Sequence, residues 1–267
     1  MTKQRLDQLM VQKGLVSSRS QAESWIRLGK VTIDGRKADK QGLFVSENAD
    51  VRLTTNESYV SRAGLKLASV AQLLKVDFRS KIVLDVGSST GGFTDYALQH
   101  GAKKVIAVDV GSHQLHPSLR KDKRIELHEK TDIRDCYLRG SDEGKRVAQA
   151  ADLLLARSDE KNRQVCLISE APHIVVIDVS FISLREILPS VARIAPNAQI
   201  VAMVKPQFEA GREQVNKGII KNDAIRRQIL RDFETWSKSL FVIQAKRDSE
   251  VAGSKGNRER FYLLQTT

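Results

Sequence analysis

The sequence predicts an α/β protein, with a mostly parallel seven-stranded sheet preceded by a small α+β domain. Two observations support this fold class. From residue 81 onward, short apolar segments alternate with amphipathic or polar ones, as strands and helices do in such folds. The first 55 residues instead show two helical patterns followed by a hairpin signal. We therefore expect domains at residues 1–55 and 61–267, joined by a polar linker over 56–60.

The N-terminal segment predicts two helices, a hairpin and a further strand. Gly14 closes the first helical pattern, and Ser18 with the glutamine three residues later has the spacing of a capping box that begins the second. Asp34-Gly35 supplies the positive φ angles of a tight turn, so 31–38 is predicted to be a hairpin. Residues 51–53 would return as the last strand.

In the larger part of the chain, apolar segments have the length and composition of strands. Residues 136–172 are long and charged, and we interpret them as helix and loop. A helix is expected over 94–100, directly after a glycine-rich turn. The expected strands are 81–87, 105–108, 124–129, 173–178, 199–204, 239–245 and 260–265.

Composition is that of folded domains, and the charge favours a polyanionic partner. The 267 residues are 41% apolar and 28% charged, which is ordinary for globular proteins. Forty-four Lys and Arg against 32 Asp and Glu give a net charge of +12. Each Lys or Arg that reaches a phosphate releases counterions, so nucleic acid is a suitable partner. Many basic proteins bind no nucleic acid, so charge alone does not decide.

Several classes of protein are excluded by what the sequence lacks. Its two cysteines, Cys136 and Cys166, form neither a disulfide framework nor a zinc site, and its five histidines lack metal-ligand spacing. The N-terminal residues MTKQRLDQLM lack the apolar core of a signal peptide. No stretch approaches the roughly 18 apolar residues of a membrane span. We expect a soluble, cytoplasmic protein that holds no metal and contacts no membrane.

The turn after the first expected strand is suited to a ribose-containing cofactor. The strand over 81–87 ends in an acid and a glycine, residues 88–93 are rich in glycine, and the next strand ends in Asp109. This is the layout of a Rossmann-like half, in which glycines let the backbone approach a ligand and a carboxylate accepts both hydroxyls of a ribose. A glycine-rich turn without a ligand is the alternative.

The sequence of this turn, DVGSSTGGF, argues against a dinucleotide. It lacks the G-x-G-x-x-G spacing that covers a pyrophosphate, and Asp85 is poorly suited to face one. A carboxylate there suits the α-amine of S-adenosylmethionine. Thr131 and Asp132, at the tip of the third expected strand, could hold an adenine amino group. We therefore expect S-adenosylmethionine as the cofactor.

Asp178 and Lys205 stand at the ends of two apolar strands, at the sheet edge where open α/β folds bind ligands. Alone, the acid could be a helix cap and the lysine a solvated side chain. Together they suit methylation of a ribose 2′-hydroxyl, which needs a base. A lysine is a base only if its pKa falls toward neutrality through burial and a neighbouring cation, and a carboxylate must orient it. The sequence also offers a second lysine, Lys66, just before the first expected strand, and a second acid, Glu259, at the start of the last.

The N-terminal stretch RLDQLMVQKGLVSSRSQAESWIRLGKVTIDGRKA resembles the small RNA-binding module of a small-subunit ribosomal protein, pseudouridine synthases and tyrosyl-tRNA synthetases. The resemblance implies a face that lies against structured RNA, which is read mostly through shape and backbone. A solvated helix face is the alternative interpretation of the same charges. The residues implied at the contact are Arg5, Ser18, Arg19, Arg27 and Lys30.

Behind that module, the motifs SRAGLKL, DVGSSTGGF, IDVSFISL and MVKPQFEAG resemble the TlyA family of rRNA 2′-O-methyltransferases, whose catalytic domain is FtsJ-like. The resemblance covers essentially the whole chain and implies a class I methyltransferase sheet with its last strand antiparallel. It also implies a catalytic tetrad of Lys66, Asp178, Lys205 and Glu259. The implied cofactor-binding residues are Asp85, Gly87, Ser89, Thr90, Gly91, Gly92, Phe93, Asp109, Val110, Thr131 and Asp132.

Within this resemblance Lys205 is the base, held by Asp178 and Glu259, while Lys66 steers the hydroxyl or lowers the pKa of its partner. The implied reaction is S-adenosylmethionine-dependent 2′-O-methylation of ribosomal RNA in ribosomal subunits, at a cytidine. Arg258 and Arg260 depart from the family pattern, because they place more charge around Glu259 than the pattern predicts.

Two alternative functions make different demands on the sequence. A non-catalytic RNA-binding or ribosome-assembly factor predicts a damaged pocket or tetrad, whereas every position is filled here. Relatives are also labelled haemolysins, but a membrane-lytic protein needs an exposed amphipathic segment and an export route, and neither is visible in the sequence.

Overall fold

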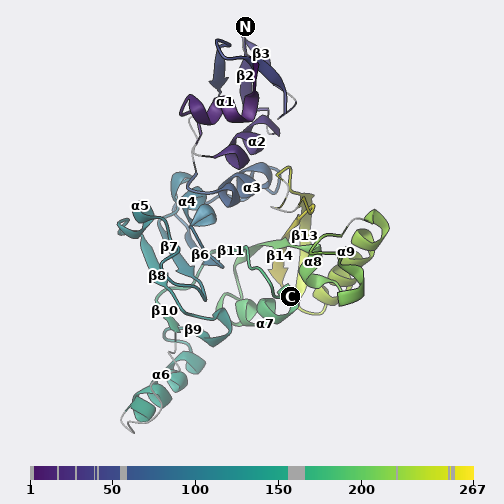
Figure 1. Cartoon of the computed structure of the whole chain (residues 1–267). Coiled ribbons are helices and arrows are strands. Elements are labelled where there is room, and N and C mark those ends of the chain that lie inside the picture. The colour runs from purple at the N-terminus through teal and green to yellow at the C-terminus, as the bar shows by residue number, and fades with distance from the viewer. Residues whose placement is uncertain are drawn as a thin grey trace.

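The structure is a computed structural model of the 267-residue chain. Figure 1 shows the N-terminal helices and short strands at the top, the large sheet below them, and a single helix that projects away at the bottom. The structure describes all residues except 1, 2, 17, 28, 39, 41, 55–58, 156–165, 221, 252, 254 and 255.

The N-terminal domain contains the helices and the hairpin that the sequence predicts. Asp34 and Gly35 have φ angles of 49° and 78°, which form the expected tight turn. Ser18 Oγ accepts a hydrogen bond from Gln21 N at 3.2 Å and so begins the second helix. The elements are β1 (Lys3–Arg5), α1 (Leu6–Gln12), α2 (Arg19–Arg27), β2 (Val31–Ile33), β3 (Arg36–Lys37), β4 (Phe44–Ser46) and β5 (Val51–Leu53).

These strands form two small sheets, one of which the sequence did not predict. β2 pairs with both β3 and β5, as expected, and β1 pairs with β4. β1 and β4 have three residues each, which is too short for a period-2 pattern to be recognised. The domain has an apolar core in which Leu6, Met10 and Trp25 are almost fully buried.

The large sheet has the predicted seven strands in the order β13-β14-β12-β11-β6-β7-β8. β14 is antiparallel to both of its neighbours, and the other strands run parallel to one another, as the resemblance implied. The strands are β6 (Ile82–Val86), β7 (Lys104–Val108), β8 (Ile125–His128), β11 (Ile174–Ile177), β12 (Gln199–Val204), β13 (Phe241–Asp248) and β14 (Arg260–Thr266).

Helices cover both faces of this sheet. Alternate strand residues belong to two apolar clusters: Val83 packs with the residues of α3 and α4, and Leu84 with those of α7 and α9. The helices are α3 (Arg62–Ala71), α4 (Gly92–Gln99), α5 (Pro117–Arg120), α6 (Asp142–Leu155), α7 (Leu184–Ile194), α8 (Pro206–Glu209) and α9 (Asp223–Ser237), with 3-10 turns η1 (Ile133–Asp135) and η2 (Arg212–Gln214).

The segment 136–172 contains more strand than expected. β9 (Cys136–Leu138) and β10 (Cys166–Ile168) form a parallel pair, and α6 projects away from the body of the protein (Figure 1). The helix was predicted but the three-residue strands were not, because neither has a recognisable pattern of its own. Residues 156–165 of the predicted loop lie outside the described residues.

The end of the predicted linker is packed against the larger domain. Residues 56–58 of the linker lie outside the described residues, but Tyr59 is buried and its ring lies 5.5 Å from that of Tyr96. Val60 N donates to Asp95 Oδ2 at 2.8 Å. α3 then begins beside α4, and this contact is close: a Cβ placed on Gly92 would lie 2.3 Å from Ser61 Oγ and 2.7 Å from Gly64 N.

We expect Gly92→Ala to separate α3 from α4 and to lower the free energy of unfolding by about 1–3 kcal/mol, because a backbone atom blocks the added methyl group. Urea denaturation measures the change. Gly42→Ala is the control, since its Cβ would meet only the Arg5 side chain at 3.6 Å or more. Equal stability of the two variants would show that the helices do not touch as described.

Candidate active site

Three adjoining cavities lie along the carboxyl edge of the sheet. The first, of about 540 Å³, is lined by residues that follow β6, β7, β8 and β11; the second, of about 360 Å³, lies between α3, α8 and the start of β14. A small cavity of about 130 Å³ lies at Asp85 and shares lining residues with both. Ser180 lines all three, so the cavities form one continuous site.

The first cavity contains four of the expected cofactor-binding residues beyond the glycine turn: Asp109, Val110, Thr131 and Asp132. Asp109 accepts hydrogen bonds from Ser89 N at 2.8 Å and from Gly111 N at 2.7 Å. These bonds fix the carboxylate, and each oxygen keeps lone-pair capacity for a ribose hydroxyl. Both oxygens of Asp132 already accept hydrogen bonds from the Arg134 guanidinium, so they have less capacity left for a ligand than those of Asp109. The same contact lowers the pKa of Asp132.

Asp85 is fully buried at the small cavity, and one of its oxygens has no partner. Asp85 Oδ2 accepts a hydrogen bond from Thr94 Oγ1 at 2.6 Å, whereas Oδ1 has no hydrogen-bond partner among the described residues. Burial, and to a lesser extent the charge of Asp178, raises the pKa of Asp85 to about 7. An unpartnered buried carboxylate oxygen at a cavity is suited to a cationic ligand, and the α-ammonium group of S-adenosylmethionine is one.

The glycines of the turn have different surroundings. Gly87 has a φ of 81° and lines the first and the small cavity, and a Cβ there would lie 2.9 Å from Asp178 O. Gly91 and Gly92 line none of the three cavities: Gly91 faces Leu115 and Leu119, and Gly92 faces the start of α3. The remaining residues expected to bind the cofactor, Ser89, Thr90 and Phe93, line the small cavity.

Lys205 and Asp178 lie together where the cavities meet. Lys205 Nζ is 2.6 Å from Asp178 Oδ1 and donates to Ser180 Oγ at 2.8 Å. Lys205 lines both the second and the small cavity, whereas Asp178 lines the first and the small one. Pro206, the next residue, ends β12 and is the first residue of α8, so the amine stands at the strand tip.

Lys66 and Glu259 form the second ion pair of the site. Lys66 Nζ is 2.6 Å from Glu259 Oε2, and both residues are more than nine-tenths buried. The resemblance implied that Glu259 holds Lys205, and the structure pairs it with Lys66. β12 and β14 pair with Val204 opposite Arg260, so Lys205 and Glu259 are the next residues to face each other, and both line the second cavity. The Lys66 ammonium group, which α3 carries, nevertheless lies closer to the Glu259 carboxylate.

Sequence reasoning missed several residues of the second cavity. Phe181, which is 91% exposed and has a φ of 65°, packs its ring 5.1 Å from that of Phe208. Gln207 Oε1 is buried and has no hydrogen-bond partner among the described residues. Ser180 and Phe181 are part of the IDVSFISL motif, and Gln207 and Phe208 follow Lys205 directly, so nearness to Asp178 and Lys205 was the available signal.

The basic residues expected at the RNA contact surround α2. Arg5 and Arg19 both donate to the fully buried carboxylate of Asp7, with shortest distances of 2.9 Å. The hydrogen bond from Arg5, followed by that from Arg19, holds the pKa of Asp7 below its usual value. Arg27 and Lys30 are exposed, and Ser18 caps the helix. These residues are thus on or beside one helix, and two of them are held in place.

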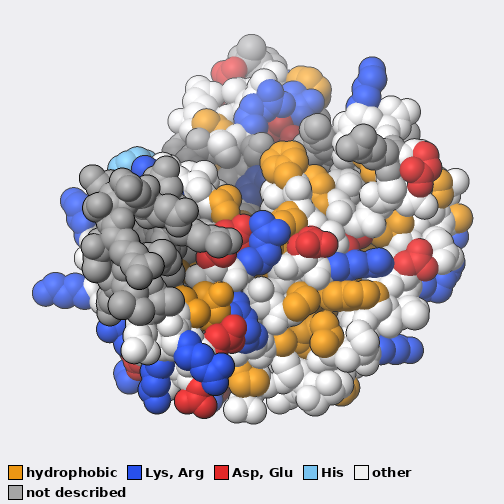
Figure 2. Space-filling model, turned by 90° about the horizontal axis from the view of Figure 1, so that it is seen from below, with side chains coloured by type: hydrophobic (Ala, Val, Ile, Leu, Met, Phe, Trp, Pro, Cys, Tyr) orange, Lys and Arg blue, Asp and Glu red, His pale blue; other side chains and the backbone are white. Residues whose placement is uncertain are grey.

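One face of the protein carries no concentrated positive charge. On the face shown in Figure 2, Lys and Arg side chains are spread among acidic and apolar ones and form no single patch. Among the described residues, no helix is long and apolar enough to cross a membrane. Nor does this part of the chain hold a cluster of three or more His, Cys, Asp or Glu residues that could bind a metal ion.

The strand order, the glycine turn after β6 and the unpartnered Asp85 oxygen together define an S-adenosylmethionine-dependent methyltransferase. The pattern of the FtsJ-like methyltransferase family matches residues 59–266, and that of the S4 domain matches residues 4–51.

Individual relatives match along nearly the whole chain. It is 34% identical to the 16S/23S rRNA (cytidine-2′-O)-methyltransferase TlyA of Mycobacterium tuberculosis, covering 98% of this chain and 90% of that protein. It is 35% identical to Hemolysin A of Brachyspira hyodysenteriae, covering 96% and 97%. A solved structure from Streptococcus thermophilus has a TM-score of 0.66 at 35% identity, covering 100% of this chain and 90% of that one.

The chain belongs to the TlyA family of FtsJ-like methyltransferases. It is therefore an enzyme, and its cofactor is S-adenosylmethionine. The residues around the first and the small cavity fit this cofactor, because they offer a carboxylate for the ammonium group and another for the ribose.

The buried Asp85 leads to a pH-dependent prediction for the cofactor-free protein. Because its folded-state pKa of about 7 lies above the ordinary 3.8, the folded protein binds more protons than the unfolded chain between these values. The free energy of unfolding should therefore fall as the pH rises through this range. Asp85→Asn should remove this part of the slope in urea denaturation between pH 5 and 8. Parallel curves for the two proteins would contradict the burial of an uncompensated carboxylate.

Proposed function

We propose that this enzyme transfers a methyl group to the 2′-hydroxyl of a cytidine in ribosomal RNA, with Lys205 as the base. The supporting observation is the position of Lys205 between the second cavity, which is open to a substrate, and the small cavity beside Asp85. Lys66 lines only the second cavity, so of the two buried lysines it lies farther from the cofactor-binding residues.

In this mechanism each residue has a separate task. A ribose in the second cavity would present its 2′-hydroxyl to Lys205, and Nζ would act as the general base that takes the hydroxyl proton as the oxygen becomes methylated. Asp178 and Ser180 fix the direction of the amine through their contacts at 2.6 and 2.8 Å. Bound S-adenosylmethionine supplies the methyl group. Asp85 and Asp109 would hold the cofactor, in line with their carboxylates at the two cavities.

The second ion pair would serve the substrate. The Lys66 ammonium group lies in the cavity that would receive the ribose, where it can donate a hydrogen bond to the 2′-oxygen as negative charge develops there. Glu259 keeps Lys66 in position at 2.6 Å. These roles differ from those of a tetrad in which both acids hold Lys205, because here Glu259 pairs with Lys66.

The choice of substrate rests on the relatives. The Mycobacterium tuberculosis and Campylobacter jejuni proteins are named rRNA (cytidine-2′-O)-methyltransferases, the first for 16S/23S rRNA and the second for 23S rRNA. The S4 domain and the net charge of +12 suit an RNA substrate. Ribosomal RNA as substrate would also place the enzyme in the cytoplasm, as expected from the sequence.

Incubating separated ribosomal subunits with the enzyme and radiolabelled S-adenosylmethionine, then mapping the label, tests this function. Label on the 2′-oxygen of a cytidine is the expected result, and label on a base or on no RNA would refute the proposal. The second outcome would favour the non-catalytic RNA-binding factor. Release of contents from lipid vesicles by the protein alone would favour the lytic alternative that the Hemolysin A relative suggests.

We expect Lys205→Met to reduce methyl transfer by about a hundredfold or more, because the base is removed, while the affinity for S-adenosylmethionine changes by less than about threefold. Calorimetry and a filter-binding transfer assay measure the two quantities. Lys103→Met, at an exposed lysine before β7 at the opposite edge of the sheet, is the control and should transfer normally. Normal turnover by Lys205→Met would remove Lys205 from the mechanism.

The RNA-binding role of the N-terminal domain is tested at two exposed positions. The double variant Arg27→Gln/Lys30→Gln should weaken binding to ribosomal RNA and reduce the slope of log affinity against log salt by about 1 for each phosphate that is no longer neutralised. S-adenosylmethionine affinity should stay unchanged. An unaltered salt slope would show that these side chains contact no phosphate.

A further inference from the structure

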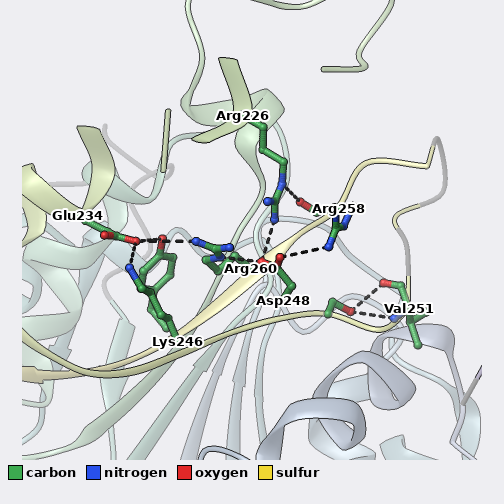
Figure 3. A network of polar contacts seen from close by, with 9 residues as sticks. Arg226, Glu234, Lys246, Asp248, Val251, Arg258 and Arg260 are labelled. Carbon is green, nitrogen blue, oxygen red and sulfur yellow. Dashed lines mark hydrogen bonds and ion pairs between the residues drawn. The ribbon is translucent and has the colours of Figure 1, made fainter. Parts of the chain in front are cut away.

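A network of charged side chains joins α9 to the last two strands beside Glu259. Figure 3 shows Arg226 reaching from α9 toward Asp248 and Arg258, with Arg260 close to the same carboxylate. Arg226 Nη2 donates to Asp248 Oδ1 at 2.8 Å, and Arg260 Nε donates to the same oxygen at 2.6 Å. Burial alone would raise the pKa of Asp248, but the hydrogen bonds from Arg260 and Arg226 outweigh it and lower that pKa.

Arg226 also reaches the backbone next to Glu259. It is 7% exposed, and its Nε donates to Arg258 O at 3.0 Å. The next carbonyl of this segment is also held: Ser249 N, from the residue that follows β13, donates to Glu259 O at 3.0 Å. The chain at 258–260 is therefore held through the Arg258 carbonyl, the Glu259 carbonyl and the Arg260 guanidinium.

The side chains of this segment alternate between two faces. Arg258 and Arg260 turn toward Asp248, and the Glu259 carboxylate turns the other way, to Lys66 and the second cavity. The two arginines that depart from the family pattern are thus directed away from the site. Their ion pairs with Asp248 give the segment a fixed orientation, which in turn fixes the direction of Glu259.

We propose that Arg226 is a positioning residue for Glu259: it holds the Arg258 carbonyl directly and Arg260 through Asp248, and so keeps the Glu259 carboxylate on Lys66. Arg226 lines none of the three cavities and takes no part in the chemistry itself. The inference rests on the proposed function, because it assigns Glu259 a task in methyl transfer. The alternative is a purely structural role, in which Arg226 only fastens α9 to the edge of the sheet. Comparing variants of Arg226 and Lys246 separates this role from the positioning of Glu259.

Arg226→Met should reduce kcat about ten- to a hundredfold, because a carboxylate displaced by about 1 Å no longer holds Lys66, while KM for S-adenosylmethionine stays within about twofold. Lys246→Met is the matched control. It removes the 2.8 Å ion pair between β13 and Glu234 of α9. Glu234 keeps its 4.0 Å contact with Arg260, and the bonds of Arg226 and Asp248 to residues 258–260 stay in place, so kcat should be normal. Equal losses in both variants would mean that fastening α9 is what matters, which overturns the proposal.

A double-mutant cycle tests the route through Glu259. In a Glu259→Gln background, where the carboxylate is already absent, adding Arg226→Met should lower kcat by less than about twofold. The full loss in that background would show that Arg226 acts elsewhere and would overturn the proposal. If Arg226→Met does not fold, Asp248→Asn removes the other half of the ion pair and takes its place in the cycle.

Hydrogen exchange gives a measurement that needs no RNA. In Arg226→Met or Asp248→Asn, the Ser249 amide, which is bonded to Glu259 O, should exchange about tenfold or more faster than in the unaltered protein. Unchanged protection would overturn the positioning role. If the unaltered enzyme methylated no ribosomal RNA, the proposed function would fail, and faster Ser249 exchange would still show that Arg226 holds this segment.

Discussion

The parallel pairing of β6, β11 and β12 gathers the functional groups of the site. In this register Ile177 lies opposite Val86 on one side and Ala202 on the other. Residues that follow these strands are therefore brought to one edge, where Asp178 meets Lys205 and the glycine turn after β6 lies beside them. β14 enters from the opposite direction and brings Glu259 to the same edge from the start of a strand rather than its end.

Buried charge at this edge is nearly balanced, and the imbalance indicates where ligands bind. Lys205 is compensated by Asp178 and Lys66 by Glu259, whereas one Asp85 oxygen has no partner in the part of the chain that the structure describes. An uncompensated buried carboxylate lowers the stability of the cofactor-free protein and favours a ligand that carries the missing cation. The buried Asp85 carboxylate thus lowers the stability of the cofactor-free protein and raises its affinity for a cationic ligand. The Arg226 network restrains the segment that carries Glu259.

Most of the sheet could be predicted, and the failures have physical reasons. The long strands at the centre of the sheet were found because each is an apolar segment buried on both faces. β1, β4, β9 and β10 were missed because three residues show no period. Gly91 and Gly92 were expected at the cofactor on the strength of a motif, but their glycine character also serves packing against Leu115, Leu119 and α3.

Local pattern and short motifs were enough to predict the two-domain order, the strands of the large sheet, and which acids and lysines stand at strand ends. The partners of those groups were fixed by packing in three dimensions. Glu259 pairs with Lys66 rather than Lys205, and Arg258 and Arg260 turn away from the site toward Asp248 and Arg226. Such pairings depend on how closely segments far apart in the chain approach one another, and no spacing in the sequence records that distance.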